Sequence, residues 1–148
     1  MKRMLCGLAT AAVSFASLAQ STPVGLWKTL DNETKRERSQ VRITESGGVF
    51  TARLEKLSDM PEPEKLFCSK CVDDRKDKPL LGLELIRGVR RSGEVDSPLW
   101  DGGTLLDPAN GKTYKVRLTP IEDGRQLQVR GYVGAPEFGR TQIWIRVE

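Results

Sequence analysis

The chain has 148 residues, with 24 lysines and arginines against 20 acidic residues and no histidine. Without histidine, no Ser-His-Asp or Cys-His arrangement is available for nucleophilic catalysis, and a zinc site would have only thiolates and carboxylates as ligands. The net charge of +4 is too small to indicate a nucleic-acid-binding protein, which would carry a basic face.

The first 19 residues have the pattern of a secretory signal peptide. Lys2 and Arg3 precede an apolar run over 4–18, and a small residue, Ala19, stands where the peptide would be cut. The run is too short and too polar for a membrane anchor. We therefore expect a mature domain of residues 20–148 in the periplasm or outside the cell, with 22 basic against 20 acidic residues once Lys2 and Arg3 are removed.

Apolar and polar residues alternate with period two along most of the mature chain, which is typical of strands with one buried face. Strands are expected over 24–30, 37–45, 49–57, 80–90, 98–106, 112–119, 125–133 and 140–147. Most connections are short and contain Gly or Asn, as in antiparallel hairpins. The sequence predicts an all-β protein with a single antiparallel up-and-down barrel of about eight strands. A two-sheet sandwich is the alternative, but only residues 58–79 are long enough for a crossover between sheets.

The long connection over 58–79 contains Cys68 and Cys71 in the sequence CSKC. Connections of this length tend to be functional or mobile. In an oxidising compartment a Cys68–Cys71 disulfide is the favoured interpretation, and a redox-active pair or a metal site are the alternatives. No metal site is predicted, because two thiolates without histidine make a poor one.

Two carboxylates are candidates for chemistry. Glu84 stands among leucines, where it either lines the barrel interior or lies on the wet face beside an arginine of a neighbouring strand. A hydrolase that uses Glu84 with Asp101 is the least favoured function, because nothing in the sequence fixes their separation. No glycine-rich phosphate loop precedes a helix, and no cofactor and no catalytic residue are predicted.

Gly25-Leu26-Trp27 on the first expected strand resembles the Gly-x-Trp of lipocalins, in which a basic residue of the last strand stacks on the Trp. Arg146 or Arg140 is placed for this cation-π contact. The blocks GLWKT, CSKC, KPLLGLEL, LLDPANGKTYKVRL, VRGYVG and GRTQIW together resemble the bacterial family catalogued as domain of unknown function 2147. The segment 91–100 departs from that family's usual pattern. The resemblance implies a secreted or periplasmic, lipocalin-like barrel and no established activity.

The favoured function is binding of a small apolar or amphiphilic ligand inside the barrel. Its wall is expected to include Val41, Ile43, Glu84, Val116, Leu118, Val129 and Ile143. The connection 58–79 would cover one mouth, and Trp27 would plug the closed end with Gly25 and Arg146. The alternative is an interaction module with a solid core that meets a protein partner of the cell envelope.

Overall fold

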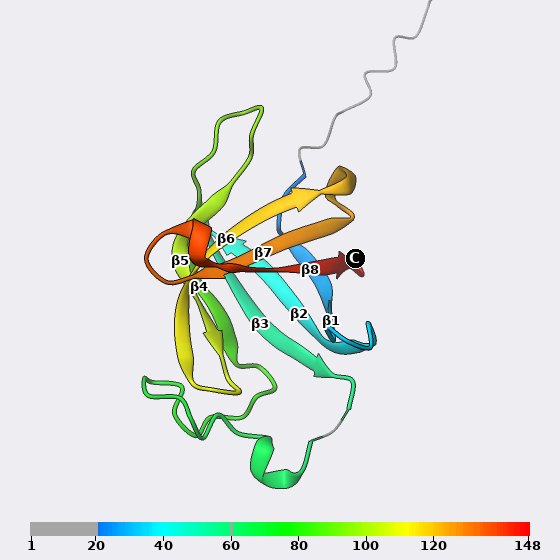
Figure 1. The fold of residues 1–148 in the computed structure, drawn as a ribbon, viewed down its shortest axis with the longest axis vertical. Coiled ribbons are helices and arrows are strands. Elements are labelled where there is room, and N and C mark those ends of the chain that lie inside the picture. The colour runs from blue at the N-terminus through cyan, green and yellow to red at the C-terminus, as the bar shows by residue number, and fades with distance from the viewer. Residues whose placement is uncertain (1–20, 60) are drawn as a thin grey trace, which may run out of the picture.

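The computed structural model describes residues 21–59 and 61–148, which form eight antiparallel strands closed into one barrel in sequence order (Figure 1). The strands are β1 Gly25–Leu30, β2 Glu37–Ser46, β3 Val49–Leu57, β4 Glu84–Arg91, β5 Trp100–Asp107, β6 Lys112–Ile121, β7 Gln126–Tyr132 and β8 Arg140–Arg146. The predicted barrel is confirmed, and the largest boundary difference is four residues, at the start of β4. The sandwich is excluded because every strand pairs with its sequence neighbour and β8 returns to β1.

Short 3-10 helices interrupt three connections: η1 Pro63–Lys65, η2 Glu122–Gly124 and η3 Pro136–Phe138. Within the described residues, no helix is long and apolar enough to cross a membrane. The predicted signal peptide over 1–19 lies outside the described residues.

Large apolar side chains fill the barrel interior. Trp27, Trp100 and Trp144 are at most 4% exposed, and Phe50 meets Trp100 edge to face with ring centroids 6.1 Å apart. Smaller side chains from alternating strand positions pack between these rings: Val41, Ile43, Leu54, Ile86, Val89, Val116, Leu118, Leu127 and Val129. An eight-stranded barrel has room for side chains or for one small ligand. In this barrel the three tryptophans occupy the half of the interior where β1 begins and β8 ends.

The last strand presents the opposite face from the one predicted. Trp144 is opposite Leu127 in the ladder and belongs to the core, whereas Ile143 is opposite the exposed Gln128. The expectation that Ile143 points into the barrel is therefore wrong. Both faces of β8 carry apolar residues, so alternation alone does not choose between them, and the larger side chain is the buried one.

The start of β4 contains an irregularity that moves Glu84 outside. Ala52 is opposite Ile86, but the next residue, Arg53, is opposite Glu84, so that one residue of β4 is extra. Such a bulge breaks the alternation of faces. Ile86 is buried in the core, and Glu84 faces Arg53 on the outer surface. The prediction that Glu84 lines the interior is wrong, and the alternative that pairs it with a neighbouring arginine is confirmed.

The two ends of the barrel carry different connections. We call the end where β1 begins and β8 ends the closed end; it carries the connections 47–48, 92–99 and 122–125. The loop end carries 31–36, 58–83, 108–111 and 133–139. Figure 1 shows the connection 92–99 at the top of the molecule and the long connection 58–83 at the bottom.

Candidate functional site

Trp27 and Arg146 stack at the closed end. The Arg146 guanidinium carbon lies 4.2 Å from the centroid of the Trp27 ring, which confirms Arg146, rather than Arg140, as the stacking residue. Gly25 has φ +144°, and a Cβ there would overlap an Arg146 guanidinium nitrogen. The glycine therefore permits both the backbone conformation and the close approach of the arginine.

Arg146 also ties three chain segments together. Its Nε donates to Gly124 O at 2.6 Å, Nη1 donates to Val24 O at 2.7 Å and Nη2 donates to Thr22 O at 2.7 Å. Burial lowers the pKa of Arg146, but a guanidinium remains protonated at neutral pH. The charged group thus fixes the segment before β1 against the turn that follows β6.

Beside this stack lies a hollow of about 530 Å³, which we call the closed-end hollow. Its wall comes from the segment before β1, the β4–β5 connection with its flanking residues, and the end of β6 with η2. The lining residues are Ser21, Thr22, Arg91, Val95, Pro98, Trp100, Pro120, Ile121, Glu122, Asp123 and Gly124. Apolar and charged side chains thus meet in one concave site.

Trp100 connects the closed-end hollow to the barrel core. It is buried, and its Nε1–H has no hydrogen-bond acceptor among the described residues. A buried donor without a partner costs free energy, so such a group indicates a missing acceptor. The guanidinium carbon of Arg91 lies 5.8 Å from the Trp100 ring centroid, and within the described chain Arg91 forms no ion pair. The site therefore offers an indole donor and an unneutralised cation.

Five of the predicted wall residues lie in the packed interior. Val41, Ile43, Val116, Leu118 and Val129 are each at most 1% exposed. None of them lines the closed-end hollow or a second hollow of about 300 Å³ on the outer surface, which lies around the Arg42–Glu55 ion pair. Their role as ligand contacts stays a prediction.

Glu84 and Asp101 do not form a catalytic pair. Glu84 pairs with Arg53 at 2.7 Å and with Arg87 at 2.5 Å. Asp101 is opposite Arg90 on the β4–β5 ladder, six residues along β4 from Glu84, which corresponds to roughly 20 Å. Two carboxylates at this separation cannot act on one glycosidic bond.

The predicted Cys68–Cys71 disulfide is present, and both cysteines are buried. The surrounding segment is folded: Cys68 N–H donates to Lys78 O, and Phe67 forms a bridge with Pro79. A Cβ at Gly111 would overlap the Lys70 carbonyl, so the segment packs directly on the β5–β6 hairpin. The disulfide thus shapes a compact element at the loop end.

An ion pair and a hydrogen bond to the backbone attach the same segment to β4. Asp74 accepts two hydrogen bonds from Arg87 at 2.8 Å, and the buried Arg75 donates to Glu84 O at 2.7 Å. The segment therefore lies against β4 and the β5–β6 hairpin. That it covers the barrel mouth stays a prediction.

Sequence reasoning did not find Arg91 and Trp100 as site residues, nor the turn at 120–124. The three segments that form the closed-end hollow are distant in sequence, and no spacing relates them. Arg91 falls just after the expected strand 80–90, and Trp100 lies near the start of the expected strand 98–106, where period-two alternation makes it an ordinary strand residue.

Comparisons with known proteins support the fold. Residues 25–146 match the family described as "Uncharacterized protein conserved in bacteria (DUF2147)". The chain is also similar to the solved structure of protein HP1028 from the human pathogen Helicobacter pylori, which is described as belonging to the lipocalin family. The TM-score is 0.66 at 21% identity, over 84% of this chain and 82% of that chain, and at this identity the likeness shows the fold alone. No curated protein matches the chain.

Proposed function

Because the chain belongs to the bacterial DUF2147 family and has a lipocalin-like barrel, we propose that it binds a small amphiphilic ligand, and that the ligand occupies the closed-end hollow rather than the barrel interior. The observation that carries this proposal is the pairing of a 530 Å³ hollow with the unsatisfied Trp100 Nε1–H. Ligand pockets are typically about 300–1,000 Å³ with a few polar groups that fix orientation.

The filled interior supports a site outside the core. Trp27, Trp100 and Trp144 occupy the interior at the closed end, and each is nearly fully buried. Opening that space would require moving large rings out of a close-packed core, which costs several kcal/mol per ring. The closed-end hollow needs no such rearrangement.

The lining defines the ligand's chemical class. Val95, Pro98 and Pro120 offer apolar surface, while Arg91 offers a cation next to the Trp100 ring. A ligand with an apolar body and one anionic group would place the body against the prolines and the charge near Arg91. An acceptor atom of the same ligand would supply the missing partner of the indole N–H.

We also place the protein in an oxidising compartment outside the cytoplasm. The buried Cys68–Cys71 disulfide and the expected signal peptide over 1–19 support this placement. Intact mass of the exported protein tests it, because cleavage near Ala19 removes a defined mass. A chain that retains residues 1–19 after export would contradict the expectation.

A fluorescent amphiphilic anion, 8-anilinonaphthalene-1-sulfonate, tests the ligand site. We expect one molecule to bind per chain, and Arg91→Ala to weaken binding. The matched control is Arg90→Ala, because Arg90 is the next residue but lies opposite Asp101 on the outer face. Equal weakening by both substitutions, or no binding of the probe, would reject the closed-end hollow as the site. Native mass spectrometry of the exported protein then shows whether a natural ligand is retained.

The interaction module remains the second candidate, because the solid core also fits it. Apolar side chains are exposed at the loop end, among them Val72 at 90% and Phe138 at 82%. An envelope protein partner is therefore the expectation if neither the probe nor a natural ligand binds.

A further inference from the structure

The barrel is closed by a short seam between β1 and β8. Two pairs of strand residues face each other across it, Trp27 with Arg146 and Lys28 with Ile145, and just past the end of β8 Leu26 forms backbone hydrogen bonds with Val147 and Glu148. Beyond Ile145 the two strands separate, and residues 140–144 of β8 have no facing strand on the β1 side within the described chain. Figure 1 shows the end of β8 beside β1 and its beginning far from it.

The direction of the backbone groups on this free edge follows from the β7–β8 ladder. Arg146 N–H donates to Arg125 O, and the register continues without a shift through Trp144–Leu127 to Arg140–Gly131. Residues of an antiparallel strand alternate between bonding one neighbour and the other. Arg140, Gln142 and Trp144 therefore bond β7, while the N–H and C=O groups of Thr141 and Ile143 point away from β7 to the free edge.

We propose that this free edge pairs with the same edge of a second copy of the chain, antiparallel and centred on Gln142. In that register Thr141 of each copy lies opposite Ile143 of the other. The two N–H and two C=O groups of each edge then all find partners, and no like charges are directly opposed. An interface that uses the same patch twice produces a closed two-fold dimer.

The length of the edge fits this pairing. Five residues are free, and a twofold pairing centred on their middle residue uses all five. At one end the edge is limited by the pairing of Ile145 with Lys28 of β1, and at the other by Gly139 and the preceding η3. Arg130 Nε donates to Pro136 O at 2.7 Å, which holds η3 toward β7, and Thr141 and Gln142 are exposed.

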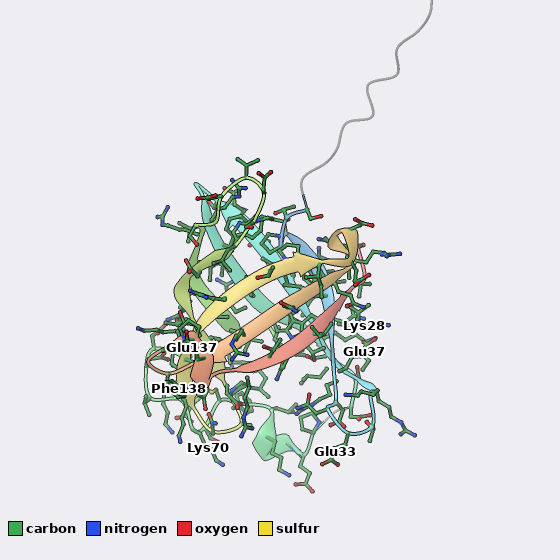
Figure 2. The ribbon with its side chains drawn as sticks, turned by 45° about the horizontal axis from the view of Figure 1, so that its top comes forward. Lys28, Glu33, Glu37, Lys70, Glu137 and Phe138 are labelled. Atoms are coloured by element: carbon green, nitrogen blue, oxygen red, sulfur yellow. A yellow bond between two sulfur atoms is a disulfide. The ribbon has the colours of Figure 1, made fainter. Side chains whose placement is uncertain are left out.

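Apart from Arg140 at its first position, the edge lacks the features that keep edge strands apart. Thr141, Gln142 and Ile143 include no charge, no proline and no glycine. Proteins that avoid edge-to-edge pairing place lysine, proline or a bulge at such positions. Phe138, 82% exposed, and Val133, 68% exposed, lie in the turn that leads into β8. Figure 2 shows Phe138 near the beginning of β8 and Lys28 toward its other end.

Two variants that differ at one position test the register. T141E/I143E places Glu opposite Glu at both cross-strand pairs of the dimer, whereas T141E/I143K places Glu opposite Lys. Position 141 lies opposite Arg130 of β7, so T141E also changes a contact within one copy. Because both variants carry T141E, this effect is the same in both and does not contribute to the difference between them. By sedimentation velocity over a concentration series, we expect wild type and T141E/I143K to dimerise. The dissociation constant of the T141E/I143E dimer should be at least about tenfold higher than that of T141E/I143K, because like charges directly opposite destabilise a pair of strands and opposite charges stabilise it.

Amide exchange by NMR gives a second measurement on the unmodified protein. The Thr141 and Ile143 amides should exchange more slowly as concentration rises, while the Gln142 amide, already bonded to β7, should not change. A wild-type chain that stays monomeric into the millimolar range would overturn the proposal. So would a dimer that both variants form equally, or one in which the Thr141 and Ile143 amides stay unprotected.

Discussion

Replacing Asp73 by alanine should destabilise the protein more than removing an exposed carboxylate. Arg75 is 3% exposed, and Asp73 accepts three hydrogen bonds from its guanidinium at 2.6–3.2 Å. Without Asp73 the buried cation keeps only the bond to Glu84 O. Breaking a buried ion pair costs about 3–5 kcal/mol, but Asp73 is 36% exposed and water can replace part of the contact, so we expect about 2 kcal/mol.

The matched control is Glu55→Ala. Glu55 lies 2.6 Å from Arg42, but both side chains are more than a third exposed, so this substitution should cost less than about 1 kcal/mol. Arg75→Met should cost less than Asp73→Ala, because it removes the buried charge together with its desolvation. Urea unfolding followed by circular dichroism measures all three. A loss for Glu55→Ala as large as that for Asp73→Ala would refute the assignment of the buried pair.

The same pair predicts a dependence of stability on pH. Hydrogen bonds from Arg75 lower the pKa of Asp73 to about 2, below its ordinary value of 3.8. A carboxyl whose pKa is lower in the folded state stabilises it above the unfolded pKa, and this contribution is lost as the pH falls through the folded value. The stability difference between wild type and Asp73→Asn should therefore shrink between about pH 4 and pH 2. A difference that stays constant over this range would exclude the linkage.

Three further substitutions test the elements that shape the barrel. Gly25→Ala should cost about 2 kcal/mol or more, measured by thermal unfolding, because it strains a positive φ and displaces Arg146. Arg146→Ala should lower the free energy of unfolding by about 3 kcal/mol, since three carbonyl acceptors and the Trp27 ring lose their partner. The control Arg140→Ala should lower it by less than about 0.5 kcal/mol. Equal losses of stability would contradict the stacking role of Arg146. Joint replacement of Cys68 and Cys71 by alanine should lower the free energy of unfolding by about 2 kcal/mol, because the disulfide closes a ring of only four residues. A double variant that fails to fold would show that the disulfide has a larger role in stability.

Much of the fold was predictable because its signals are local. Alternation with period two needs only neighbouring residues, and glycine- or asparagine-containing turns mark where one strand ends and the next begins. The disulfide followed from spacing and from the expected compartment. Gly25, Trp27 and Arg146 were identified through a family resemblance, and the stack at 4.2 Å agrees with it.

Where two strand faces are equally plausible, tertiary packing decides. Period two placed Ile143 on the buried face of β8, which is wrong, because Trp144 of the opposite face belongs to the core. On β4 one extra residue reverses the alternation, so that Glu84 lies outside and Ile86 inside. A bulge arises from pairing with a partner strand, and a single strand's sequence carries no mark of it.

The sequence by itself determined the strands, their antiparallel order and the disulfide, since each depends on residues close together in the chain. Only the tertiary structure decided that the interior is filled, that a hollow lies at the closed end, and that the seam between β1 and β8 stays short. These properties depend on how segments more than a hundred residues apart meet. The register of β1 against β8 is set by the closure of the whole barrel, not by either strand alone.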